Sequence, residues 1–275
     1  MASATVKDYY TLLKPGVMSL IVFTGVAGFA MADGSKNIYL MAITLLAISL
    51  ASGGAAALNM WYDADIDKIM KRTKKRPLPL GKIASDDALA YGIILCVIAL
   101  VLNILASNIL STTLLIAAIL FYVFVYTIWL KRRTPQNIVI GGAAGAFPPL
   151  ISYVAISNQI TAEAVLMFLI IFLWTPPHFW ALALYRNDDY KKANVPMLPV
   201  VRGIEYTLKN IFIYTLLLIA STYAIYFVGF KLGIIYLATA TLANISFMCY
   251  VLHLSKNPTP ENSIKTFLHS ILYLF

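Results

Sequence analysis

The chain has 275 residues, of which 60% are hydrophobic and only 12% are charged, and its mean hydropathy is +0.80. This composition excludes an ordinary soluble domain, in which about a quarter of the residues carry a charge. It also excludes a disordered chain, which combines low hydrophobicity with high net charge. The net charge of +9 does not indicate a nucleic-acid partner in so apolar a chain, and the positions of the basic residues must decide what it means.

Apolar runs long enough to cross a bilayer follow one another along the chain. A transmembrane helix needs about 20 mostly apolar residues, and eight runs meet this need: 15–32, 38–58, 88–107, 110–130, 138–156, 162–184, 211–230 and 232–254. A ninth run, 264–275, is too short for a full crossing. The runs are continuously apolar rather than alternating, which favours helices over barrel strands. We therefore predict an all-α integral membrane fold of about nine transmembrane helices, eight full and the ninth partial.

The basic residues gather on one side of these predicted spans. Only two of the 21 Lys and Arg residues, Lys36 and Lys231, fall in the connections on the other side, 33–37, 108–109, 157–161 and 231. Short loops rich in Lys and Arg mark the cytoplasmic side, so we expect that side to hold the N-terminus and the loops 59–87, 131–137, 185–210 and 255–263. Most of the acidic residues lie there too, although acids contribute little to orientation. We expect no cleavable signal peptide, because the first long apolar run begins only at Pro15.

The first acidic segment follows the second predicted span. Asn59, Asp63 and Asp67 are spaced four residues apart, which places them on one stripe of a helix with 3.6 residues per turn. Three oxygen-bearing side chains suit a hard cation such as Mg²⁺, which often shares its shell with substrate phosphates. The basic stretch 71–82 then suits phosphate oxygens. The alternative is a helix end with solvated charges, and we prefer that interpretation for Asp65.

The second acidic segment follows the sixth predicted span. Tyr185 and Asp189 are also four residues apart, whereas Asp188 and Asp189 are adjacent and repel each other unless a metal or a base neutralises them. The two segments lie four spans apart on the same side. We therefore expect one transmembrane domain over residues 1–275, built from two pseudo-repeated halves of about 1–135 and 136–275, with the acidic segments facing each other across one cavity.

The sixth predicted span contains a histidine behind two prolines. Pro176 and Pro177 are expected to break the helix, and broken helices are tolerated where they line a cavity. His178 follows directly, and an ionisable residue inside a span is a functional candidate by default. It could ligate a haem iron or be a hydrogen-bonded histidine at a helix end, and both interpretations stay open. The basic loop 131–137 could contact diphosphate or haem propionates, or it could serve as an orientation signal.

Small residues in the spans have a structural interpretation. The runs 52–57 and 141–146 are rich in Gly and Ala, which favours close helix approach. Neither is a phosphate loop, because no preceding strand and no following Lys-Ser or Lys-Thr pair is present. Cys96 and Cys249 each lie in an apolar run and are predicted to be small buried hydrophobes rather than a disulfide pair or metal ligands.

The motifs together resemble a known superfamily. The spacing of the first acidic segment, followed by Arg-Pro-Leu at 76–78, resembles the UbiA superfamily of intramembrane prenyltransferases. The longer strings at 174–190, with Pro-Pro-His-Phe-Trp near their start, and at 195–200 are similar to the branch of that superfamily that farnesylates haem. The string 11–15 fits too, so the resemblance covers essentially the whole chain.

This resemblance implies an activity and its ligands. We expect nine helices around a central cavity with a cytoplasmic cap, and a Mg²⁺-dependent transfer of a farnesyl group from farnesyl diphosphate to haem B, which gives haem O. The resemblance also implies the bilayer as environment, a bacterial plasma membrane as location, and a haem A synthase or a terminal oxidase assembly as possible partner. Many relatives have two acids spaced by four in the second segment, whereas this chain has Tyr185 at the first position, which argues against a second metal held as tightly as the first.

The candidate site residues fall into three groups. The catalytic candidates are Asn59, Asp63, Asp67, Tyr185, Asp188 and Asp189. The substrate-binding candidates are Arg72, Arg76, Lys131, His178, Trp180 and Lys192. The metal-ligand candidates are Asn59, Asp63, Asp67 and Asp189. Aromatic faces suited to steady an allylic cation belong to Trp61, Tyr62, Phe179, Trp180 and Tyr185.

Three other functions compete with this one. A prenyltransferase for aromatic or quinone-precursor acceptors would share the Mg²⁺ chemistry and differ in its acceptor pocket. A transporter or channel is a second possibility, but the acids lie at predicted cytoplasmic helix ends rather than at the midplane where transporter sites cluster. A haem-binding scaffold would bind haem and release no diphosphate.

Overall fold

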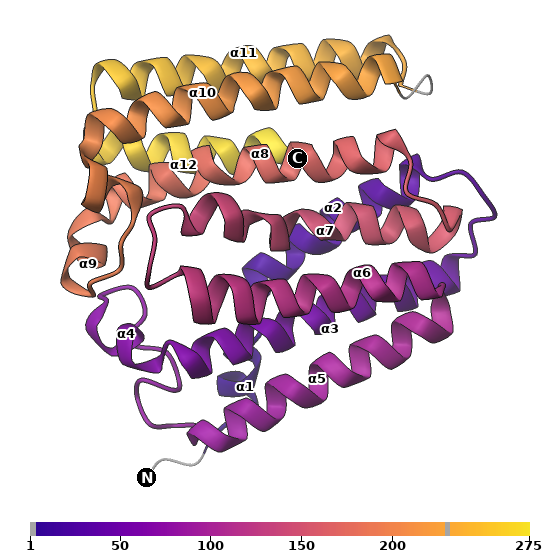
Figure 1. Cartoon of the computed structure of the whole chain (residues 1–275), viewed down its shortest axis with the longest axis horizontal. Helices are drawn as coiled ribbons and strands as arrows, with labels where there is room; N and C mark the ends of the chain where they lie inside the picture. Colours follow the sequence, from indigo (N-terminus) through magenta and orange to yellow (C-terminus); the bar gives the residue numbers. More distant parts are fainter. Residues whose placement is uncertain (1–3, 229–231) are drawn as a thin grey trace. The chain divides into compact units, whose positions relative to one another are not determined.

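Helices make up the regular structure of the chain. The computed structural model describes residues 4–228 and 232–275, and no β-strand occurs among them, so the all-α prediction is confirmed. In chain order the elements are α1 (Val6–Leu12), α2 (Pro15–Met31), α3 (Ile38–Tyr62), α4 (Ala64–Ile69), α5 (Ser85–Ala106), α6 (Ile109–Leu120), the π-helix η1 (Phe121–Leu130), α7 (Asn137–Ser157), α8 (Ala162–Tyr185), α9 (Asn187–Lys192), α10 (Leu198–Val228), α11 (Ile234–Lys256) and α12 (Pro260–Leu274) (Figure 1).

The membrane-spanning elements agree with the predicted runs. Seven helical segments are each long and apolar enough to cross a membrane, namely α3, α5, α6 together with η1, α7, α8, α10 and α11. An eighth crossing results if α1 and α2, which are bent by 53° at their junction, count as one broken span. α12 has 15 residues, and the predicted total of nine is not confirmed. Lys231 and the end of the predicted span 211–230 lie outside the described residues.

The predicted break in the sixth span is wrong. α8 continues through Pro176 and Pro177 as one helix from Ala162 to Tyr185. Each proline removes one N–H from the helix ladder, but its fixed φ is itself helical, and prolines are tolerated in transmembrane helices where nearby groups satisfy the freed backbone. The Thr175 hydroxyl donates to the Ile171 carbonyl at 2.8 Å, directly before the carbonyls of Phe172 and Leu173 that the prolines leave without a helical N–H.

α10 is longer than the apolar run predicted. It begins at Leu198 rather than at 211, and Gly203 inside it has a non-helical φ of +83°. The segment was missed because Arg202, Glu205 and Lys209 interrupt its apolar character. The helix is kinked at Gly203. Glycine suits this position because it reaches positive φ without the steric cost of a side chain.

The chain divides into two compact units. Unit 1 comprises Met1–Leu130 and Phe147–Ile160, and unit 2 comprises Lys131–Ala146 and Thr161–Phe275. The first acidic segment belongs to unit 1 and the second to unit 2. The single domain with two pseudo-repeated halves and the cavity shared by the two acidic segments stay predictions.

Unit 1 is built on close packing of α3 against α5 (Figure 1). A Cβ atom added at Gly54 of α3 would lie 2.7 Å from the carbonyl oxygen of Gly92 in α5, so the two helix backbones meet where both residues are small. This confirms the packing role predicted for Gly54. Farther along these two helices lies a core of buried apolar residues that also includes residues of α6 and α7, formed by Ile48, Ala51, Ala99, Leu115 and Ile151.

A second close approach in unit 1 gives a stability prediction. A Cβ atom at Gly28 of α2 would collide with the backbone of Pro149 in α7, lying 2.9 Å from its Cα atom, whereas one at Gly16 would meet nothing within 4 Å. Overpacking typically costs about 1–3 kcal/mol, so we expect Gly28→Ala to lower the midpoint of thermal unfolding in detergent. Gly16→Ala, in the same helix, is expected to leave it unchanged or raise it slightly, since alanine is the better helix former. Equal midpoints for the two variants would contradict the packing.

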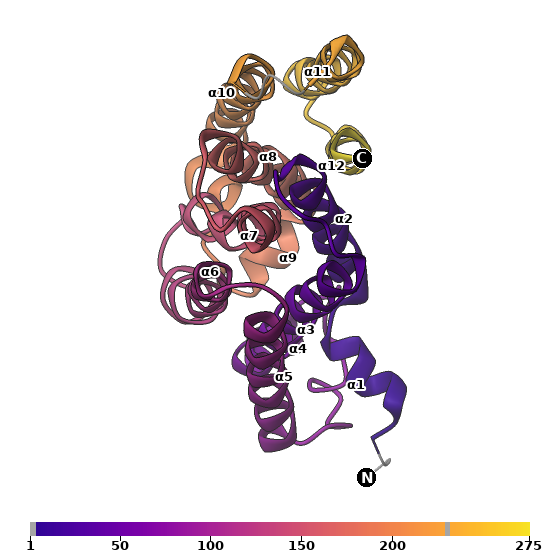
Figure 2. The ribbon, with the colours of Figure 1, turned by 90° about the vertical axis from the view of Figure 1, so that its right-hand side faces the viewer.

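Unit 2 is a set of neighbouring helices joined through α8. α10 and α12 each pack on α8, and α11 packs on α10 and α12 (Figures 1 and 2). A Cβ atom at Gly142 of α7 would lie 2.8 Å from the Thr175 side chain of α8, so the small residues of 141–146 permit this approach as predicted. Cys96 is buried, but Cys249 on α11 is exposed, so its predicted burial is wrong. Apolar runs in a membrane protein also face lipid, which explains the difference.

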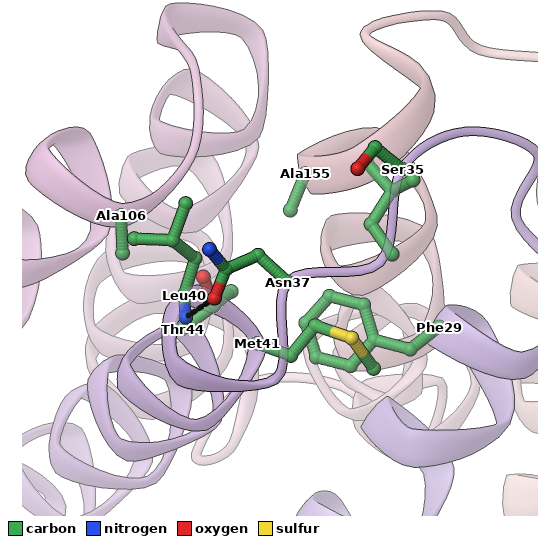
Figure 3. A pocket seen from close by; sticks show the side chains of 9 residues that line it. Phe29, Ser35, Asn37, Leu40, Met41, Thr44, Ala106 and Ala155 are labelled. Atoms are coloured by element: carbon green, nitrogen blue, oxygen red, sulfur yellow. Dashed lines mark hydrogen bonds between the residues drawn. The ribbon is translucent and has the colours of Figure 1, made fainter.

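A small cavity lies in unit 1 where α2 turns into α3. Its volume is about 90 Å³, and Figure 3 shows Phe29, Asn37, Met41 and Thr44 around it. Asn37 is also the N-cap of α3, where its side-chain oxygen accepts a bond from the Leu40 N–H at 3.3 Å. At 1.5 Å per residue, about 20–30 Å of α3 separate this cavity from Asn59, so the cavity is not part of the first acidic segment.

Candidate functional site

The first acidic segment joins the end of α3 to the short helix α4. α3 ends at Tyr62, and Asp63 lies at the junction with a φ of −91° and a ψ of 11°. Helical hydrogen bonds nevertheless continue, because the Asp63 N–H donates to the Asn59 carbonyl at 3.0 Å and the Asp67 N–H to the Asp63 carbonyl at 2.8 Å. The three side chains are only 4%, 1% and 2% exposed, in the order Asn59, Asp63 and Asp67. The helical spacing therefore buries three oxygen-bearing groups.

The Asn59 amide is held from both sides. Its Nδ2 donates to Asp63 Oδ2 at 2.7 Å and to the Thr127 hydroxyl at 3.1 Å, while its Oδ1 accepts a bond from Lys14 Nζ at 2.7 Å. Lys14 comes from the junction of α1 with α2 and Thr127 from η1, so three separate segments meet at this one residue. Sequence reasoning missed both partners, although each is a polar residue beside or inside an apolar run.

Arg76 is bound to the third residue of the segment. Its Nη1 lies 2.6 Å from Asp67 Oδ2, and the two side chains are 17% and 3% exposed. The Thr73 hydroxyl donates to the Asp67 backbone carbonyl at 3.1 Å. The arginine side chain predicted to bind phosphate is thus held against a predicted metal ligand, while Arg72 is exposed.

Apolar packing fixes the basic loop that carries Arg76. Leu78 and Ile83 are buried in one cluster with Leu12 of α1 and with residues of α3 and α5. Trp61, which is partly buried, packs against this same cluster. Burying each such side chain is worth about 1.5–3 kcal/mol, which gives the loop a defined position beside Asp67.

Two tyrosines of η1 accompany the first segment. The rings of Tyr122 and Tyr126 lie 5.5 Å apart, on the same π-helix as Thr127, whose hydroxyl accepts from Asn59. A π-helix has more residues per turn than an α-helix and often occurs at functional sites. Here it directs Thr127 to Asn59. The apolar run 110–130 contained no signal for this change of helix type.

The donors of the first segment fit a hard cation that shares its shell with a ligand. Among residues 4–228 and 232–275, no three His, Cys, Asp or Glu side chains gather to hold a metal by themselves. Asn59, Asp63 and Asp67 supply one amide and two carboxylates, all buried. Mg²⁺ prefers such oxygen donors and usually binds through one or two carboxylates plus water and substrate phosphates. The residues present therefore fit Mg²⁺ bound together with a diphosphate.

The second acidic segment joins α8 to α9. Tyr185 ends α8, and the guanidinium of Arg186 lies over its ring, 4.6 Å from the centroid. Asp189 in α9 is buried with 6% exposure, whereas Asp188 and Lys192 are exposed. The structure thus buries Asp189, the predicted metal ligand, and exposes its neighbour Asp188. Only Asp189 has the burial that an ordered ligand site requires.

Unpartnered polar atoms concentrate in this segment. Four buried atoms have no hydrogen-bond partner among the described residues, namely Trp180 Nε1, Arg186 Nε, Asn187 Oδ1 and Asp189 Oδ2. Buried polar groups are nearly always paired, so such exceptions need an explanation. Trp180 is 1% exposed and packs edge-on against Tyr214, with centroids 5.4 Å apart. Two donors and two acceptors within ten residues suit a polar ligand that supplies their missing hydrogen bonds.

His178 is a hydrogen-bonded histidine on α8. Its Nδ1 lies 2.7 Å from the Ser270 hydroxyl of α12, and that hydroxyl donates its one hydrogen to the Phe267 carbonyl at 2.6 Å. With its proton on Nδ1, His178 donates to this hydroxyl and keeps a lone pair on Nε2. Trp174 stacks on the ring at a centroid distance of 4.2 Å. This tautomer is the one that a metal-ligating histidine adopts when its other nitrogen donates to a protein oxygen.

The remaining candidates are less defined. Asp65 is exposed on α4, in agreement with the preference for a solvated charge. Lys131 is half-buried in the short loop before α7 and has interaction partners of its own. Phe179 lies edge-on to His178 with centroids 5.0 Å apart.

Comparison with known proteins gives a consistent result. The model of the UbiA prenyltransferase family matches residues 21–272. The protoheme IX farnesyltransferase of Rickettsia bellii is 48% identical over 273 residues, covering 99% of this chain and 91% of that protein. The protoheme IX farnesyltransferase of Orientia tsutsugamushi is 49% identical over 273 residues, covering 99% of this chain and 87% of that protein.

Solved structures share the fold. A structure of digeranylgeranylglyceryl phosphate synthase has a TM-score of 0.80 at 21% identity, covering 98% of this chain and 94% of that one. A UbiA homologue from Archaeoglobus fulgidus bound to DMAPP and Mg²⁺ has a TM-score of 0.72 at 16% identity, covering 97% and 96%. With the family model matched over most of its length and relatives at nearly half identity, this chain is an integral membrane protein that belongs to the UbiA prenyltransferase family.

Proposed function

We propose that this chain transfers a farnesyl group from farnesyl diphosphate to a vinyl group of haem B, in a Mg²⁺-dependent reaction that gives haem O and diphosphate. The observation that carries the proposal is the buried set of Asn59, Asp63 and Asp67 with Arg76 beside it, in a chain about half identical to curated protoheme IX farnesyltransferases over nearly its whole length. Oxygen donors and a guanidinium are the groups that a metal-bound diphosphate needs.

The first task of the site is to hold the leaving group. Arg76 would bind diphosphate oxygens, and Asn59, Asp63 and Asp67 would hold the metal, with Asp189 a further candidate from the second segment. Mg²⁺ supplies electrostatic stabilisation of the charge that develops on the departing diphosphate. Such stabilisation is strongest where water is excluded, because the local dielectric constant is low, and the burial of these side chains supports that condition.

The second task is to direct the carbocation. The allylic C–O bond breaks and its electron pair leaves with the diphosphate. The π electrons of the haem vinyl group form the new C–C bond to the farnesyl carbon, and water captures the resulting cation with loss of a proton to solvent, which gives the hydroxyethylfarnesyl substituent. Tyr122 and Tyr126 can stabilise the allylic cation through their ring faces. A vinyl group is a weak nucleophile, so the protein contributes orientation rather than a general base.

The haem acceptor is the part of the proposal that separates this enzyme from relatives with aromatic acceptors. His178 supports it, because a hydrogen bond from its Nδ1 to Ser270 would leave the Nε2 lone pair for an iron atom. Trp180 Nε1 and Arg186 Nε are donors from which an oxygen of a propionate or a phosphate could accept. The distribution of basic residues supports placing these segments on the cytoplasmic side of a bacterial plasma membrane, where a haem A synthase or an oxidase assembly could receive the product.

The direct test is product formation by the purified protein. Incubation with haem B, farnesyl diphosphate and Mg²⁺ is expected to give haem O, identified by mass spectrometry, with release of diphosphate, and EDTA is expected to prevent both. Farnesylation of an aromatic acceptor but not of haem B would assign the chain to another prenyltransferase of the family. Haem binding without diphosphate release in the complete mixture would indicate a scaffold, and either result would refute the proposal.

The role of His178 gives a spectroscopic prediction. If Nε2 ligates the iron, haem B added to the purified protein is expected to show a shifted Soret band, and His178→Ala is expected to abolish that shift because the ligand is lost. His253→Ala is the matched control, since His253 is exposed at the end of α11. The comparison uses difference spectra at equal haem occupancy. A shift that survives His178→Ala would exclude His178 as the iron ligand while leaving the transfer reaction to the mass-spectrometric test.

A further inference from the structure

Lys14 is held in an unusual backbone conformation at the edge of the first acidic segment. Its φ of 52° and ψ of 63° lie in the left-handed region, which a residue without glycine's freedom seldom adopts. The residue also precedes Pro15, and a following proline restricts the backbone further. The 53° bend between α1 and α2 occurs here. Strain of this kind persists where the surrounding structure requires it and concentrates at functional sites.

The result of this conformation is a specific contact. Lys14 Nζ donates to Asn59 Oδ1 at 2.7 Å, while Asp63 and Thr127 both accept from Asn59 Nδ2. The amide orientation is therefore fixed, with its nitrogen toward Asp63 and its oxygen toward Lys14. An amide binds a metal ion through its oxygen. Lys14 consequently occupies the very atom that Asn59 would offer to Mg²⁺.

Two cations cannot share this oxygen at low cost. An ammonium group and a divalent ion on one acceptor would repel each other strongly in a buried setting, where screening by water is weak. The lysine side chain has a flexible four-carbon stem and binds phosphate oxygens as a point charge. Lys14 is only half-buried, so part of its side chain is accessible to solvent. A diphosphate that arrives with the metal brings negatively charged oxygens. These oxygens can replace Asn59 Oδ1 as the partner of the ammonium group.

We propose that Lys14 is a positioning residue that exchanges partners during substrate binding. In the substrate-free protein, Lys14 donates to Asn59 Oδ1 and so fixes the orientation of the amide. When a metal–diphosphate complex binds, the ammonium group moves from Asn59 Oδ1 to a phosphate oxygen. This inference rests on the proposed function, since it takes a prenyl diphosphate as the ligand. It predicts opposite effects of Lys14 on the metal alone and on the complete ligand.

The test measures two affinities in Lys14→Met and Lys14→Gln. Binding of Mn²⁺ alone, followed by its electron paramagnetic resonance signal, is expected to become about threefold to tenfold tighter, because Asn59 Oδ1 no longer has a competing cation. Binding of farnesyl thiolodiphosphate with Mg²⁺, measured by calorimetry, is expected to become about tenfold weaker, since one charge–phosphate contact is lost, a change equivalent to about 1.4 kcal/mol. Lys14→Arg should retain most of the analogue affinity. Lys7→Met, on the exposed face of α1, is the control and should change neither.

The opposite signs separate exchange from a merely structural role. If both affinities fall together in Lys14→Met and Lys14→Gln, Lys14 only supports the fold and the inference is wrong. It is also wrong if neither changes. Lys14→Gln guards against misfolding, because its amide can still donate a hydrogen bond toward Asn59 while it lacks the charge. Failure of the unaltered protein to bind the analogue at all would instead overturn the proposed function.

Discussion

Asp63→Ala is expected to reduce farnesyl transfer by about 10³-fold or more while the protein remains folded in the membrane. Asp63 is 1% exposed and contributes a carboxylate where a diphosphate-bound cation would need one. Removing a group that stabilises the charge of the leaving group costs several kcal/mol of activation free energy, and each 1.36 kcal/mol corresponds to a factor of ten in rate. The measurement is the rate of haem O formation at saturating substrates, with diphosphate release followed in parallel.

Two companion variants define the cause of that loss. Asp63→Asn keeps an oxygen that can accept from Asn59 Nδ2 but removes the charge, so it should be nearly as inactive as Asp63→Ala if charge is what matters. Asp65→Ala removes the same kind of group two residues away, on the exposed face of α4, and is expected to retain activity within about threefold. Equal activity in the Asp63 and Asp65 variants would exclude the metal assignment.

Much of this architecture follows from patterns that lie along the sequence. Apolar runs identify spans because backbone groups inside a bilayer must be paired internally, which leaves the helix as the simplest solution. The four-residue spacing of Asn59, Asp63 and Asp67 identified the buried stripe because local hydrogen bonds preserve helical geometry across the junction at Asp63. Features of this kind depend on neighbours in the chain.

Other features depend on contacts between distant segments and left no such pattern. The bond between Lys14 and Asn59 joins residues 45 positions apart, and that between Asn59 and Thr127 joins residues 68 apart. The π-helical geometry of η1 looks like any apolar run in the sequence. The helix break predicted at Pro176 and Pro177 is wrong for a related reason. A proline's local preference to interrupt a helix is outweighed by the packing of α8 against α10 and α12.

The adjacent aspartates of the second segment show how burial distinguishes two carboxylates that are neighbours in the chain. Asp188 is exposed, whereas Asp189 is buried and its Oδ2 has no hydrogen-bond partner among the described residues. Burying a carboxylate oxygen without a partner costs free energy, so the substrate-free protein tolerates Asp189 at the expense of stability. Functional sites commonly show this conflict between stability and activity.

Asp189→Asn is therefore expected to act in two directions at once. It keeps the shape of the side chain and removes the buried charge, so the midpoint of thermal unfolding in detergent should rise by a few degrees, since about 1 kcal/mol shifts the midpoint of a large domain by about 2–4 °C. Haem O formation should fall by about 100-fold or more, because the carboxylate is needed once metal and diphosphate bind. Asp188→Asn is the matched control and should change neither quantity appreciably. Loss of activity in Asp188→Asn but not in Asp189→Asn would show that exposure, not burial, marks the functional carboxylate of this segment.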